Sequence, residues 1–127
     1  MKPHNDWILK AGEDLEAAKR LIDGKEPLTE PAIYHTQQCA EKALKAFLAF
    51  HDREIEKIHD LKILLDACAK FDPAFEDLKN EANFVNPFGI MFRYPGAEMS
   101  PDIETVKEAI VAAEKIYNFV SEKFSNG

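Results

Sequence analysis

Apolar residues in the last quarter of the chain recur at strictly alternating intervals of three and four residues. The positions are Ile103, Val106, Ile110, Ala113, Tyr117, Val120 and Phe124. On an α-helix this spacing puts every one of them on the same side. Ser100 as N-cap and Pro101 at the first helical position are start signals for such a helix. A seam of this length must pack along neighbouring helices, so it predicts a helical fold built around residues 101–124.

Earlier segments repeat this helical periodicity. Helices are predicted from about Asp6 to Asp23, from Thr29 as N-cap to about His51, and from His59-Asp60 onward, with a shorter one opening at Pro73. No alternating apolar pattern of useful length occurs, so no sheet is expected. The sequence therefore predicts an all-α fold. It is an up-and-down antiparallel bundle of about five helices, with residues 1–127 forming a single domain.

The connection before the last helix is unusual because residues 83–96 combine Pro and Gly with many apolar side chains. It is expected to be irregular and to fold back on the bundle or meet a partner. The stretch from Phe84 to Pro95 offers more apolar surface than a monomer normally leaves in water. It therefore predicts a homodimer.

The net charge and the cysteines restrict what the protein can bind and the compartment in which we expect it. The formal charge of −7 opposes non-specific binding to DNA or RNA. Cys39 and Cys68 lie inside apolar helical patterns, which favours buried thiols over a disulfide and a reducing cytoplasm over an oxidising compartment. No stretch approaches the roughly 18 apolar residues of a membrane span, and no charged leader precedes the first helix. A cytoplasmic protein that does not enter membranes is expected.

The second predicted helix carries a stripe of polar side chains. His35, Gln38, Lys42 and Lys45 follow one another at intervals of three, four and three, so they share one face. An imidazole, an amide and two ammonium groups can hydrogen-bond a base or sugar and neutralise phosphate. The alternative is a solvated helix face with one intrahelical pair, Glu41 to Lys45.

Two further positions could carry chemistry. His59, at the start of a helix, could face a groove with its ring held by a carboxylate; alternatively, Asp60 is simply an N-cap and His59 a loop residue. Arg93, flanked by Phe92 and Tyr94, could meet an anion or stack on a base, or it could pair with a surface carboxylate. No pair of histidines and acids has the spacing of a recognised zinc motif, so no metal and no cofactor are expected.

These segments, taken in order, resemble the HEPN domain family. The resemblance covers nearly the whole chain and is carried by Trp7, Ala11, Asp14 and Leu15, by Gln37-Gln38-Cys39-Ala40-Glu41-Lys42-Ala43-Leu44-Lys45-Ala46, by Ile58-His59-Asp60-Leu61, and by Arg93-Tyr94-Pro95-Gly96. It implies a bundle of about five helices, frequent homodimers, and association with a small nucleotidyltransferase partner in two-component, toxin-antitoxin-like systems. It also implies a nucleotide-binding site, for which the candidates are His35, Gln38, Lys42, Lys45, His59 and Arg93.

The resemblance also implies that some members of that family are metal-independent ribonucleases, which use an arginine and a later histidine with four to six residues between them. Arg53 and His59 match this spacing, whereas Arg93 has no histidine after it. In such a pair the side chains would activate the RNA 2′-hydroxyl or protonate the leaving group. Arg53 and His59 straddle the connection between two predicted helices, which departs from the pattern. We therefore expect a nucleotide-binding or regulatory module rather than an enzyme, with an endoribonuclease toxin as the alternative.

Overall fold

Five α-helices and two short 3-10 helices make up the computed structural model, which describes residues 3–53, 57–92 and 100–125. In chain order they are α1 (Pro3–Leu21), α2 (Thr29–Phe50), α3 (Leu61–Phe71), η1 (Pro73–Leu78), α4 (Lys79–Val85), η2 (Asn86–Gly89) and α5 (Ile103–Ser125). The described residues contain no strand. This confirms the predicted all-α antiparallel bundle of about five helices.

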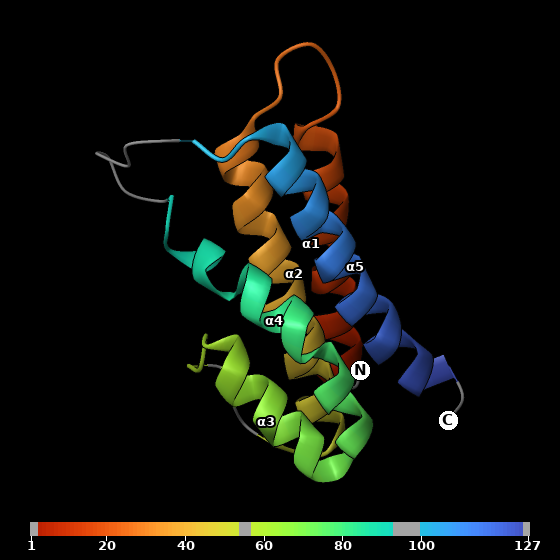
Figure 1. The fold of residues 1–127 in the computed structure, drawn as a ribbon. Coiled ribbons are helices and arrows are strands. Elements are labelled where there is room, and N and C mark those ends of the chain that lie inside the picture. Colours follow the sequence, from red (N-terminus) through yellow and green to blue (C-terminus); the bar gives the residue numbers. More distant parts are fainter. Residues whose placement is uncertain (1–2, 54–56, 93–99, 126–127) are drawn as a thin grey trace.

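The three long helices α1, α2 and α5 lie side by side, while α4 crosses in front of them and α3 packs at one end (Figure 1). The α5 seam faces this core: Val106, Ile110, Ala113 and Val120 are buried, and Tyr117 is partly buried against them. The apolar repeat thus packs as predicted against α1 and α2, with α4 as a further neighbour.

Two predicted helix starts are wrong in detail. Thr29 is the first residue of α2 and not its N-cap, a position taken by Leu28 without a side-chain hydrogen bond. Ser100 does not cap α5, which begins at Ile103; its hydroxyl donates to Glu30. Asp102 instead accepts a hydrogen bond of 2.8 Å from the backbone N–H of Thr105, as an acidic side chain before a helix commonly does.

The connection predicted to be irregular from residue 83 is more regular than expected. Helix α4 runs to Val85 and continues directly into η2, where the buried Phe88 holds the chain against the core. Ile90 and Met91, which follow, are exposed. Residues 93–96 of the same predicted connection lie outside the described residues.

Cys39 and Cys68 are both free and buried, as the sequence predicted. Burial raises the pKa of each thiol well above its ordinary value. Because the thiolate is the reactive form, neither side chain is suited to nucleophilic or metal-binding chemistry. In the part of the chain that the structure describes, no helix combines the length and apolar character needed to cross a membrane.

Candidate functional site

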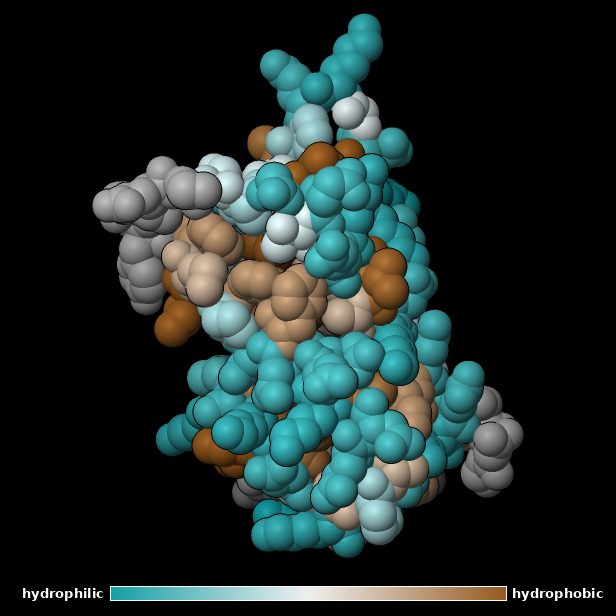
Figure 2. Space-filling model, in the orientation of Figure 1, coloured by the Kyte–Doolittle hydropathy of each residue, from teal (hydrophilic) through white to brown (hydrophobic). Residues whose placement is uncertain are grey.

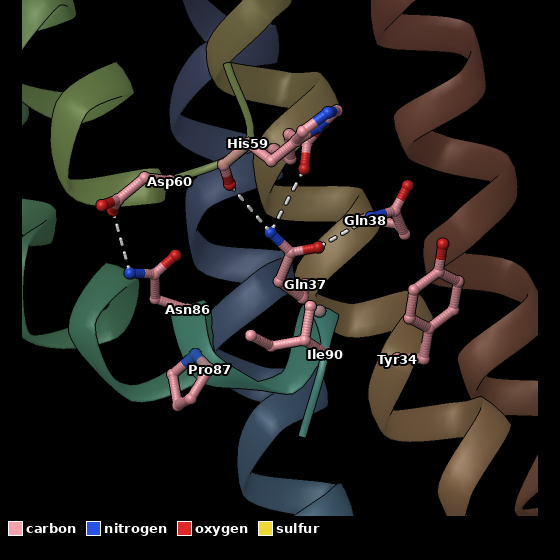
Figure 3. Close-up of a pocket in the computed structure, with 10 residues that line it drawn as sticks. Tyr34, Gln37, Gln38, His59, Asp60, Asn86, Pro87 and Ile90 are labelled. Carbon is pink, nitrogen blue, oxygen red and sulfur yellow. Dashed lines mark hydrogen bonds and ion pairs between the residues drawn. The ribbon is translucent and has the colours of Figure 1, made fainter. Parts of the chain in front are cut away.

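A cleft of about 450 Å³ opens between α2, the segment that leads into α3, and η2. Its polar lining comes from α2, from the residues just before α3 and from Asn86 of η2, and its apolar lining includes Pro87 of η2 and Ile90, which follows it (Figure 3). The lining residues are Tyr34, Gln37, Gln38, Glu41, His59, Asp60, Asn86, Pro87, Gly89 and Ile90. A concave site with apolar walls and a few convergent polar groups is the usual form of a small-molecule site.

Glu41 is the centre of the hydrogen bonds behind this cleft. Its Oε2 lies 2.9 Å from Nδ1 of His59 and accepts a 2.9 Å hydrogen bond from Nζ of Lys45. Its Oε1 accepts from Nε2 of Gln37 at 3.2 Å. Because these contacts converge on one buried carboxylate, the ring of His59 is fixed even though its side chain is 72% exposed.

Lys45 lies inside the protein. Its side chain is only 1% exposed, and its ammonium group pairs with Glu41 and lies 5.3 Å from the centre of the Trp7 ring. The intrahelical pair between Glu41 and Lys45 therefore exists, but the helix face that carries it is not solvated. An ammonium already paired and desolvated in this way is not available to a phosphate.

The start of α3 closes one side of the cleft. Asp60 accepts a hydrogen bond of 2.9 Å from the backbone N–H of Lys62, so it is an N-cap as predicted. Asn86 ties η2 to this turn, accepting from Leu61 N at 2.9 Å and donating to Asp60 Oδ1 at 3.0 Å. The carboxylate that holds His59 is that of Glu41 and not that of its neighbour Asp60.

A second cluster lies where α2 faces α1. Asp14 of α1 accepts a hydrogen bond of 2.8 Å from Nζ of Lys42 through Oδ2, and its Oδ1 lies 2.7 Å from Nδ1 of His35. The Asp14 side chain is 9% exposed, and those of Lys42 and His35 are 26% and 31% exposed. The two basic groups thus reach the surface over a buried carboxylate.

The predicted site residues are divided between these two places. Gln38 and His59 line the cleft, His35 and Lys42 belong to the Asp14 cluster, and Lys45 supports Glu41 from behind. Arg93 lies outside the described residues. Of the ribonuclease pair, Arg53 is exposed just after α2, its backbone N–H bonded to Leu48 O. The residues directly after it, 54–56, are not described.

Several site residues were not predicted from the sequence, among them the cleft residues Tyr34, Glu41, Pro87 and Ile90. Asp14 was noted only as part of the resemblance, and Gln37, Asn86 and Gly89 carried no role. Gly89 packs so tightly that a Cβ built on it would lie 2.9 Å from Cδ of Gln37. Gln37 is a polar residue among the apolar positions of its helix, and this was the one sequence signal that could have indicated its role.

No lysine or arginine lines the cleft among the residues that the structure describes; the charged groups there are Glu41, Asp60 and, when protonated, His59. The described residues also contain no group of three or more His, Cys, Asp or Glu side chains able to share a metal ion. The cleft is therefore suited to a polar, planar group and not to a bare anion.

The fold is a helical bundle, and α2 carries a cleft with polar and apolar walls. The model of the HEPN domain matches residues 4–123. The chain resembles the crystal structure of an archaeal HEPN homologue, with 30% identity, coverage of 97% of this chain and 98% of that one, and a TM-score of 0.74. It also resembles the crystal structure of a protein from Thermus thermophilus, with 27% identity, coverage of 97% and 99%, and a TM-score of 0.79. Among curated proteins, no significant match was found. This chain belongs to the HEPN family.

Proposed function

We propose that this HEPN domain is a nucleotide-binding or regulatory module that acts with a small nucleotidyltransferase partner in a two-component, toxin-antitoxin-like system of the cytoplasm. The observation that carries the binding half of the proposal is the cleft on α2 with His59 held in place by the buried Glu41. The nucleotidyltransferase partner is inferred from the family resemblance. The proposal takes the whole chain as one binding domain.

The chemistry of the cleft suits a nucleobase. Gln38 and Asn86 offer amide groups, and His59 offers a ring nitrogen, all of which can hydrogen-bond the edge of a base. Pro87 and Ile90 offer apolar contacts for the flat face of the ring. Both kinds of contact lie within one cleft of about 450 Å³.

Calorimetry with nucleoside mono-, di- and triphosphates tests the binding directly. Gln38→Ala should weaken binding roughly 2- to 10-fold, because one neutral hydrogen bond is lost. Arg93→Ala should weaken it by about 1–3 kcal/mol if its guanidinium meets the phosphate. Asn118→Ala removes an exposed amide from α5, far along the chain from the cleft, and is the matched control. The absence of any binding at millimolar nucleotide, with the fold intact, would contradict the proposal.

The partner interactions are tested separately. Exposed hydrophobic side chains include Ile90, Met91 and Val111, and apolar surface gathers over α4 and the segment after it (Figure 2). This surface supports a homodimer. A monomer in light scattering at high micromolar concentration would count against the dimer. A pull-down from the native host that recovers no small nucleotidyltransferase would count against the partner.

An endoribonuclease that uses Arg53 and His59 is the second candidate, favoured by one observation. Nδ1 of His59 faces the carboxylate of Glu41, so Nε2 of this exposed ring is the nitrogen that can meet a substrate. A histidine oriented by a carboxylate suits general acid or base work. RNA cleavage in the presence of a metal chelator, lost in both His59→Ala and Arg53→Ala, would support this candidate, and uncleaved RNA would dismiss it.

A further inference from the structure

The Asp14 cluster, formed by Asp14, His35 and Lys42, joins α1 to α2 through a buried carboxylate. Each oxygen of Asp14 has its own partner: Oδ2 accepts from Lys42 at 2.8 Å, and Oδ1 lies 2.7 Å from Nδ1 of His35. Both basic groups keep part of their side chains in solvent. The arrangement fixes two nitrogen-bearing groups side by side at the surface.

Each group keeps capacity for a ligand. Lys42 uses one N–H on Asp14, and an ammonium group has three to donate. His35 uses Nδ1 on Asp14, which leaves Nε2 as the ring nitrogen that can meet a ligand. Donors of this kind, held a short distance apart by a shared carboxylate, match the oxygens of a phosphate group.

The cluster and the cleft share one surface of α2. Gln38 lines the cleft and lies three residues after His35 and four before Lys42, which makes all three neighbours on the helix. Tyr34, another cleft residue, contacts His35 edge to face with 5.6 Å between ring centres. A bound ligand that extends from the cleft over Gln38 therefore reaches the Asp14 cluster.

The cleft and the Asp14 cluster differ in the charged groups that they present. The described cleft lining holds no lysine or arginine, and the nearby Lys45 is buried in its pair with Glu41. Within the described part of α2, the cations that reach solvent beside the cleft are those of the Asp14 cluster. A phosphate bound at this surface is stabilised there and not inside the cleft.

We propose that the ligand is a nucleoside phosphate bound in two halves: the base in the cleft and the phosphate on His35 and Lys42, across Gln38. This inference rests on the proposed nucleotide-binding function and specifies its ligand. Asp14 is the positioning residue of the phosphate half. Lys45 takes no part in phosphate binding, although it lies on the same stripe of the sequence.

The test compares adenosine, guanosine, cytidine and uridine with their 5′-monophosphates by calorimetry. On the wild-type protein, any base that binds should bind at least about 10-fold more tightly as its monophosphate, because charge-assisted hydrogen bonds are added. Lys42→Gln should remove most of that difference while leaving nucleoside affinity within about twofold. Lys70→Gln, which removes an exposed charge from α3, should leave both affinities unchanged.

Lys42→Arg separates a ligand contact from a loss of folding. It keeps the positive charge over Asp14 and should retain the preference for the monophosphate, and thermal unfolding checks that each variant is folded. Equal affinity of nucleoside and monophosphate for the wild-type protein overturns the two-part site. A Lys42→Gln variant that is folded and still prefers the monophosphate as strongly as wild type overturns it too.

The phosphate half is also measured by itself, with pyrophosphate as the probe and the His35 ring resonances as the readout. A saturable shift at millimolar pyrophosphate in the wild-type protein, absent in Lys42→Gln, supports the phosphate half even if no nucleotide binds. In that case the proposed nucleotide function fails while the anion site stands. If neither pyrophosphate nor any monophosphate shifts these resonances, both are overturned.

Discussion

Replacing Glu41 by Gln tests whether the site is built on a buried ion pair. The change removes the charge that faces Lys45 at 2.9 Å, where the two side chains are 5% and 1% exposed. Lys45 then loses the charge of its carboxylate partner and is left as a desolvated cation whose ammonium lies 5.3 Å from the centre of the Trp7 ring. Breaking a buried pair from one side costs about 3–5 kcal/mol. Because a domain of this kind is stable by about 5–15 kcal/mol, that is a large share of its free energy of unfolding.

Urea unfolding at pH 7, followed by circular dichroism and by the fluorescence of Trp7, measures the loss. The double variant Glu41→Gln with Lys45→Met removes both charges, so it should be more stable than Glu41→Gln alone, with a coupling energy of about 2 kcal/mol within the usual range for contacting residues. Lys45→Met alone leaves Glu41 with Gln37 and His59. A cost of Glu41→Gln below about 1 kcal/mol, or strict additivity in the double variant, would show that the pair is solvated and that this reasoning is wrong.

Three other predictions concern the core, the cleft and pH. Ile110→Ala truncates a buried side chain of α5 and should cost about 2–5 kcal/mol in urea unfolding; a loss under about 0.5 kcal/mol would contradict the proposed face. Gly89→Ala places a Cβ 2.9 Å from Cδ of Gln37, so the Gln37 amide must move away from its hydrogen bonds to Glu41 and His59 O; the change should cost about 1–3 kcal/mol and weaken nucleotide binding in calorimetry, and an unchanged melting temperature would contradict it. The hydrogen bond from Lys123, and then that from the Ala74 N–H, holds the pKa of Asp72 below its ordinary 3.8. This contribution is present above pH 3.8 and is lost as pH falls through the lowered pKa, so Asp72→Asn should destabilise the protein more at pH 7 than at pH 2; equal destabilisation at both would contradict it.

The fold was predictable because its strongest sequence pattern lies on a helix that packs against α1, α2 and α4. The seam of α5 is apolar at helical spacing and buried, so periodicity alone located it. The helix starts were less predictable. Ser100 was available as an N-cap, but its hydroxyl bonds Glu30 of another helix, a competition that spacing along the chain does not reveal.

The site was predictable only as a set of residue types. His35, Gln38, Lys42 and Lys45 do share one stripe of α2, but the stripe has different neighbours along its length. Trp7 and Glu41 bury Lys45, whereas Asp14 holds Lys42 at the surface. Which lysine is free for a ligand depends on these tertiary contacts and not on helical spacing.

The proposed nucleotide site on α2 can be observed residue by residue. The isotope-labelled wild-type protein is titrated with nucleoside monophosphates, and the chemical shifts are followed by NMR. We expect saturable shifts at the cleft residues Gln37, Gln38 and His59. His35 and Lys42 of the Asp14 cluster should shift in the same titration. Resonances of the exposed outer face of α5 should not move. Shifts confined to α5, or none at all at millimolar monophosphate, would contradict the claim.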